Sequence, residues 1–161
     1  MATKLMRNMT SAIIIVSIGL FAAGCSEFMK GNSVKQPRFE HVAINVPDPV
    51  AMADWYCDNL GMVIKLEAGT ARFVSDADGN MMFELYNNDT APIPDYASEN
   101  MLVLHFAFNV DDVKGTCDKL VEAGATWDKE LTVTDSGDEI ASLRDPWGVA
   151  IQFVKRAKPM L

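Results

Sequence analysis

A short pattern that occurs twice constrains the fold of this chain more than any other feature. The sequences HVAINVPD at 41–48 and HFAFNVDD at 105–112 share the frame H-x-A-x-N-V-x-D, which begins at His41 and again at His105. In each copy, apolar residues alternate with small or polar ones, and a period of two residues is typical of a β-strand. A self-match of this kind indicates that the fold is built from two equivalent modules.

Each copy opens a similar series of predicted elements. The first module, 38–87, is predicted to hold a strand over 39–46, a helix over 50–60 and strands over 62–66, 71–75 and 81–86. The second module, 101–155, is predicted to hold a strand over 102–110, a helix over 111–123 and strands over 127–134, 139–144 and 149–154. Asp48 and Gly61 are placed to cap the first helix. The sequence therefore predicts an α+β fold of two βαβββ modules, joined by a linker over 87–100.

The charge of the chain limits its partners. It carries 22 acidic and 14 basic residues, for a formal net charge of -8. An acidic body without a basic stripe argues against nucleic acid as a partner. It argues equally against electrostatic docking on an anionic lipid surface.

The N-terminal residues have the composition of an export signal. Lys4 and Arg7 precede an apolar run over 12–23, which is shorter than the ~20 residues that a membrane-spanning helix needs. The run ends in Ala22-Ala23-Gly24-Cys25, which resembles the lipobox of bacterial lipoproteins. That resemblance implies cleavage before Cys25 and acylation of this residue. The alternative is an ordinary signal peptide followed by a free cysteine.

These features divide the chain into three parts. We expect a lipoprotein signal peptide over 1–24, a lipid-anchored tether over 25–37 and a folded domain over 38–157. Ser26 follows the cysteine, which in lipoproteins usually implies transport to the outer membrane. We therefore expect an exported protein held at the cell envelope by its lipid anchor.

Two further motifs make a family resemblance specific. Leu60-Gly61 ends the first predicted helix, and Asp145-Pro146-x-Gly148 precedes the last predicted strand. Together with the doubled opening, they resemble the vicinal oxygen chelate superfamily, which includes glyoxalase I, bleomycin- and fosfomycin-resistance proteins and extradiol dioxygenases. The resemblance covers about 38–155. It implies that the two modules form an eight-stranded cup with the helices on the outer face.

The same resemblance implies a metal site inside the cup. The ligands of the superfamily come from the first and fourth strands of each module, and here they fall on His41, Glu84, His105 and Gln152. Such a set suits zinc, nickel, iron or manganese. Gln152 departs from the glutamate that is usual in glyoxalase I-like enzymes, and an amide cannot abstract a proton near neutral pH. Glu84 is therefore the expected catalytic base.

Several functions fit these residues. One is a metal-dependent lyase or isomerase, and another is a metal-free protein that binds a small molecule, as in bleomycin resistance. An extradiol-type dioxygenase and a structural lipoprotein with a vestigial cup are further alternatives. Arg72 and Arg144 are candidates for holding an anionic substrate, or else are solvated charges. A homodimer is also possible by the resemblance, with His41 and Glu84 sharing a metal with His105 of a second chain.

Overall fold

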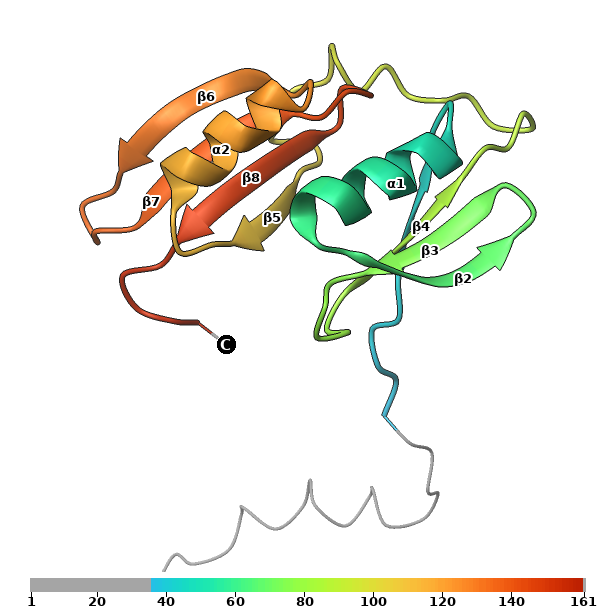
Figure 1. Ribbon diagram of the computed structural model, residues 1–161, viewed down its shortest axis with the longest axis horizontal. Coiled ribbons are helices and arrows are strands. Elements are labelled where there is room, and N and C mark those ends of the chain that lie inside the picture. Colours follow the sequence, from blue (N-terminus) through green and yellow to red (C-terminus); the bar gives the residue numbers. More distant parts are fainter. Residues whose placement is uncertain (1–35, 161) are drawn as a thin grey trace, which may run out of the picture. The chain divides into compact units, whose positions relative to one another are not determined.

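The computed structural model describes residues 36–160, and in these residues it has the predicted order of elements (Figure 1). The first module consists of β1 (Val42–Asn45), α1 (Pro49–Leu60), β2 (Val63–Ala68), β3 (Ala71–Ser75) and β4 (Met82–Tyr86). The second consists of β5 (Phe106–Asn109), α2 (Val113–Glu122), β6 (Thr126–Val133), β7 (Glu139–Arg144) and β8 (Ala150–Lys155). The prediction of two βαβββ modules is confirmed. Within 36–160, no helix combines the length and the apolar character that crossing a membrane would require.

The eight strands form two four-stranded sheets of identical topology. The first has the order β1-β4-β3-β2 and the second β5-β8-β7-β6. In each sheet the opening strand pairs in parallel with the closing strand, and the other pairs are antiparallel. The repeated motif therefore lies on an edge strand in both modules. Each helix crosses one face of its own sheet (Figure 1).

The first helix begins and ends where the sequence predicts. The Asp48 carboxylate accepts a hydrogen bond from the Ala51 backbone at 3.0 Å, which satisfies one of the free N–H groups of the first turn. Gly61 ends the helix with φ of 67°, the left-handed conformation that favours glycine. Asp112 caps α2 in the same way through the Gly115 backbone. The aspartate that ends each repeat thus caps the helix that follows the strand.

The second module departs from the prediction at its first strand. The predicted strand over 102–110 begins only at Phe106, because residues 101–104 form a turn. Asn100 stabilises this turn by accepting hydrogen bonds from Leu102 and Val103. Leu102 and Val103 are 76% and 72% exposed, so their apolar side chains do not enter the sheet. The continuous apolar run Leu102-Val103-Leu104 predicted a longer strand here, but the local hydrogen bonds of Asn100 compete with it.

Both modules lie within one compact unit that starts at Phe39, and they share a core. The rings of Phe83 on β4 and Phe106 on β5 lie 4.4 Å apart. Tyr56 of α1 donates a hydrogen bond of 2.8 Å to the buried carboxylate of Asp145 in the second module. Burial raises the pKa of Asp145 to about 6, although hydrogen bonds from Tyr56 and from nearby backbone groups oppose the change.

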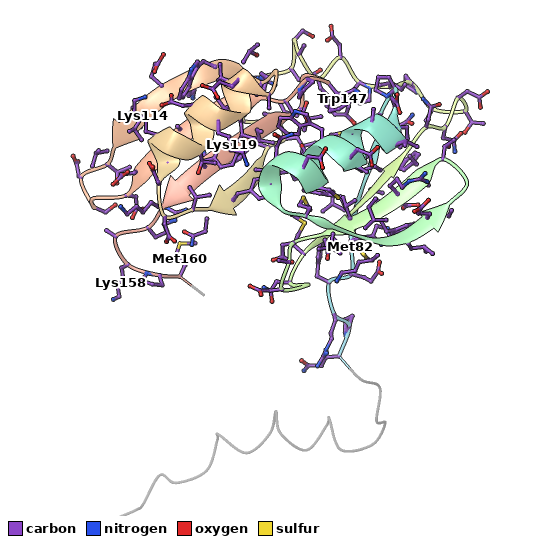
Figure 2. The ribbon with its side chains drawn as sticks, in the orientation of Figure 1. Met82, Lys114, Lys119, Trp147, Lys158 and Met160 are labelled. Carbon is purple, nitrogen blue, oxygen red and sulfur yellow. The ribbon has the colours of Figure 1, made fainter. Side chains whose placement is uncertain are left out.

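Two bonds between the helical regions reinforce this junction. The Trp55 indole donates to the Ala123 carbonyl at 2.8 Å, and Lys119 of α2 donates to the Asn59 carbonyl at 3.3 Å. Trp55 also packs edge-on against Trp147, with ring centres 6.5 Å apart. Lys119 and Trp147 are labelled in Figure 2. Trp55 and Trp147 therefore pack at the junction between the two modules.

The segment between the two sheets is held by side chains from both modules. The buried Asn45 amide donates to the carbonyls of Asn88 and Ala91 at 3.0 and 3.1 Å, and its oxygen accepts from the Asn88 backbone. Farther along, Tyr96 donates through its hydroxyl to the Asn45 carbonyl at 3.0 Å. Gly148, with φ of 84°, lies so close to this segment that a Cβ there would be 2.7 Å from the Ala97 nitrogen.

This close approach predicts a difference between two glycines. Gly61 and Gly148 both have positive φ, so alanine at either position costs about 1–2 kcal/mol in backbone strain. A Cβ at Gly61 would meet nothing within 4 Å, whereas at Gly148 it would collide with backbone of the linker. We expect Gly148→Ala to lower the free energy of unfolding by clearly more than Gly61→Ala, as urea denaturation would measure. Equal losses would contradict this description of the linker.

Candidate functional site

Two of the four predicted ligands lie together on the first sheet. His41 immediately precedes β1, and Glu84 lies on the neighbouring strand β4. The His41 Nε2 atom is 3.2 Å from Glu84 Oε2, and both side chains are about one third exposed. The parallel pairing of β1 with β4 places them on the same side of the sheet, because side chains alternate along each strand.

The other nitrogen of His41 is also engaged by a carboxylate. Its Nδ1 atom forms an ion pair with Glu40. The hydrogen bond that His41 donates to Glu40 is the main reason that the pKa of His41 is raised above its ordinary value of 6.5. Desolvation opposes this change, and the negative charges of Glu40 and Glu84 add to it. A carboxylate on one ring nitrogen fixes the orientation of the imidazole and directs the second nitrogen at its partner.

The other two predicted ligands lie on the second sheet. His105 immediately precedes β5, and Gln152 lies on β8 in register with Ala107. The Nδ1 atom of His105 is 2.9 Å from the Met101 carbonyl, and because a carbonyl only accepts, neutral His105 carries its proton on Nδ1. In that tautomer the Nε2 atom carries no proton and has an unshared electron pair. The described part of the chain contains no group of three or more His, Cys, Asp or Glu side chains close enough to hold a metal ion.

The structure therefore places the four predicted residues as two separate pairs, one on each sheet. The donor chemistry of the first pair suits a metal, since an imidazole held by a carboxylate and a free carboxylate oxygen face each other. The second pair offers an imidazole and an amide. A complete metal centre would need both pairs, or ligands from outside a single chain.

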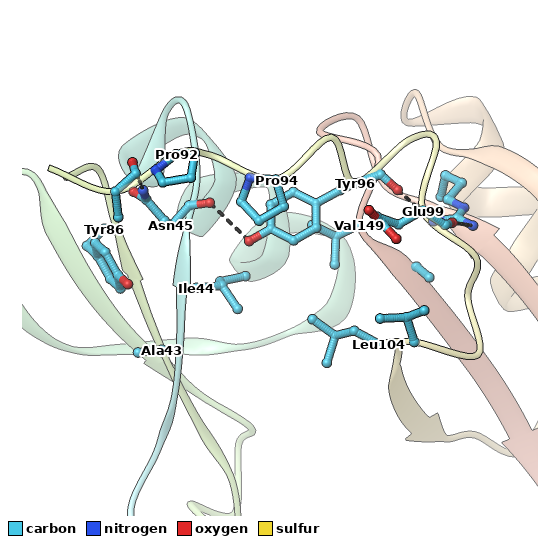
Figure 3. Close-up of a pocket in the computed structure, with 14 residues that line it drawn as sticks. Ala43, Ile44, Asn45, Tyr86, Pro92, Pro94, Tyr96, Glu99, Leu104 and Val149 are labelled. Carbon is cyan, nitrogen blue, oxygen red and sulfur yellow. Dashed lines mark hydrogen bonds between the residues drawn. The ribbon is translucent and has the colours of Figure 1, made fainter. Parts of the chain in front are cut away.

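A cavity of about 460 Å³ lies beside the first pair, between β1, the linker and the start of β8 (Figure 3). Neither His41 nor Glu84 lines the cavity. Its link to the pair is Ala43, which lines the cavity and is in register with Glu84. The lining is mostly apolar and aromatic, and comprises Ala43, Ile44, Asn45, Tyr86, Ala91, Pro92, Pro94, Tyr96, Glu99, Val103, Leu104, Arg144, Val149 and Ala150. Cavities of this size and composition are typical of small-molecule sites.

The two arginines that were candidates for an anionic substrate bind groups of the protein. Arg72 contacts Glu67 at 3.3 Å and donates to the Gly69 and Ala71 carbonyls. Arg144 lines the cavity, but its guanidinium donates to Asp128, to the linker carbonyls of Tyr96 and Glu99, and to Gly148. Arg144 thus fixes the linker that forms one wall of the cavity.

Sequence reasoning missed the contribution of the linker to the cavity. Pro92, Pro94, Tyr96 and Glu99 all line it, although the stretch over 87–100 was predicted only as a connection. Apolar and aromatic residues among prolines, in a segment that follows neither period of two nor period of 3.6, were the only available signal. Such a composition does not reveal which surface the segment covers.

Solved structures similar in fold come from several bacteria. TnmS3, described as an antibiotic binding protein from Streptomyces sp. CB03234, is 20% identical with a TM-score of 0.59, and the match covers 75% of this chain and 97% of that one. A glyoxalase family protein from Bacillus cereus is 18% identical with a TM-score of 0.66, and the match covers 81% and 99%. A glyoxalase/bleomycin resistance protein/dioxygenase family enzyme from Burkholderia phytofirmans PsJN is 19% identical with a TM-score of 0.59, covering 73% and 97%. At these identities the likeness concerns the fold.

A family model identifies the chain more directly. The model described as the glyoxalase/bleomycin resistance protein/dioxygenase superfamily matches residues 38–153, which include both copies of the repeat and all four predicted ligands. Among curated proteins there is no match. The extent of the family match, together with the two βαβββ modules, shows that the chain belongs to the glyoxalase/bleomycin resistance protein/dioxygenase superfamily.

Proposed function

We propose that this protein binds a small molecule in the cavity beside β1. The observation that carries the proposal is the cavity itself, which has about 460 Å³ of space, apolar and aromatic walls, and a linker wall that Asn45 and Arg144 hold in place. A wall fixed before binding reduces the ordering cost of association. The antibiotic-binding description of the similar protein TnmS3 supports a binding role for this fold.

Filling the cavity tests this proposal. Ala43 lies in its wall. Ala107, the equivalent residue of the second repeat, lies outside it in the wall of another cavity of about 600 Å³, so a change at Ala107 tests whether the probe binds there instead. Both residues are exposed on their edge strands, so phenylalanine is tolerated at either position. We expect Ala43→Phe to weaken binding of the neutral probe naphthalen-1-ylmethanol about tenfold or more, as measured by calorimetry, and Ala107→Phe to leave it unchanged. Equal affinity in both variants, or no binding by the unaltered chain, would refute the proposal.

A second candidate function is favoured by the pair of His41 and Glu84. These residues would hold a divalent metal, with Glu40 orienting His41 from the other side. A metal at this position would polarise an oxygen of a ligand bound in the adjoining cavity. Glu84 would then be the group that accepts a proton in a lyase or isomerase reaction, since Gln152 lacks a basic oxygen at neutral pH. His105 of a second copy is the proposed source of a further ligand.

Metal retention tests this second candidate. After dialysis against Zn²⁺ and then against buffer, elemental analysis should find metal in the unaltered chain and little in His41→Ala or Glu84→Gln. Glu40→Gln should weaken retention by roughly 10–100-fold, because it removes the partner that orients His41. Glu130→Gln, on β6 of the second sheet, is a charge-matched control and should behave as the unaltered chain does. Full retention by Glu84→Gln would exclude this pair as the metal site.

We also propose that the protein is exported and anchored to a membrane through acylated Cys25. The support is the sequence of residues 1–25 alone, which lies outside the described residues. Growth with a labelled fatty acid should label the unaltered chain and leave Cys25→Ser unlabelled, while Cys117→Ser, in the buried face of α2, should still be labelled. Labelling of Cys25→Ser would disprove the anchor.

A further inference from the structure

The cavity contains one positive and one negative side chain, and they differ in how far they are neutralised. Arg144 forms an ion pair of 2.8 Å with Asp128, and both side chains are less than one fifth exposed. Three backbone carbonyls accept its remaining hydrogen bonds at 2.8 to 3.3 Å. Its charge is therefore compensated within the protein, and four of its five N–H groups are engaged by protein acceptors.

The negative charge of the Glu99 carboxylate is not neutralised by a partner in this way. Glu99 lines the same cavity, and its backbone carbonyl accepts from Arg144, but its carboxylate takes part in none of the ion pairs within residues 36–160. The carboxylate is a free negative charge at the rim of a largely apolar space. The formal net charge of the chain, which is -8, adds to the negative electrostatic potential around this carboxylate.

The remaining walls also suit a positive charge on an apolar body. Tyr86 and Tyr96 contribute aromatic rings, whose faces attract cations. In the close-up, Ile44, Pro94 and Leu104 lie between Tyr86 and Glu99 (Figure 3). A ligand that spans this distance would place an apolar or aromatic body against these side chains and its charged end near Glu99.

We infer that the cavity selects cationic molecules, namely small amines with an apolar or aromatic body, whose ammonium group pairs with the Glu99 carboxylate. The inference rests on the proposed function of the cavity and adds a ligand class to it. Anionic molecules of the same shape are rejected, because they would face Glu99 while Arg144 is already occupied by Asp128. The selectivity is moderate, since Glu99 is exposed and solvent screens its charge.

Three probes of matched shape test the inference on the full chain. They are naphthalen-1-ylmethylamine, which is positive at neutral pH, naphthalen-1-ylmethanol, which is neutral, and 1-naphthoate, which is negative. Calorimetry should show the amine binding about threefold to fivefold more tightly than the alcohol, and the alcohol more tightly than 1-naphthoate. Added salt should reduce the preference for the amine and leave binding of the alcohol almost unchanged.

Two variants identify the charge responsible. Glu99→Gln keeps the shape of the side chain, and should remove the preference for the amine while leaving the affinity for the alcohol as it was. Glu122→Gln, at an exposed position of α2 outside the cavity, changes the net charge equally and should keep the preference. Because the backbone of Glu99 holds the Arg144 bond, the glutamine variant does not disturb the linker contact.

The outcomes separate the two proposals. If the alcohol binds in the cavity but the amine has no advantage, or the advantage survives Glu99→Gln, then the ligand class is wrong and the binding function stands. If none of the three probes binds, or if Ala43→Phe leaves all three affinities unchanged, both the binding function and the ligand class are wrong.

Discussion

The cavity depends on polar side chains of the sheets that bind the backbone of the linker. The linker residues 87–100 form neither strand nor helix, so their backbone groups need partners from elsewhere. Asn45 at the end of β1 supplies partners at one end of the linker, and Arg144 at the end of β7 supplies them at the other. Between these two ends the linker backbone at Ala97 passes close to Gly148, which has no Cβ to prevent the contact. Without these bonds the space beside β1 would have no defined outer wall.

Most of the fold could be predicted from the sequence, because the signals that specify it are local. Alternation along the two repeats predicted the opening strands, and Asp48 and Gly61 predicted the limits of α1. The exception is at the start of the second repeat, where the apolar residues Leu102 and Val103 predicted a longer strand but lie in a turn that Asn100 stabilises. Hydrogen bonds between residues two or three positions apart leave only a weak signal in a sequence, yet those of Asn100 compete with the start of β5.

The candidate site was predictable in part. The family resemblance implied that His41 and Glu84 share a site, and the His41 Nε2 atom is 3.2 Å from Glu84 Oε2. The separation of this pair from His105 and Gln152 depends on how the two modules pack, which involves Tyr56 with Asp145 and Phe83 with Phe106. Contacts between residues so distant in sequence leave no periodic pattern. The role of Arg144 was hidden for the same reason, because its acceptors are carbonyl groups of the linker.

The way the linker is held also bears on how such a protein diverges. Asn45 and Arg144 bind main-chain atoms of Asn88, Ala91, Tyr96 and Glu99, and every residue type presents those atoms in the same way. Side chains along this stretch can therefore be exchanged during evolution while the anchoring bonds persist. Substitutions in this stretch can then change ligand preference without changing the stability of the fold. A single ancestral architecture can therefore acquire new ligands through changes confined to a few neighbouring codons.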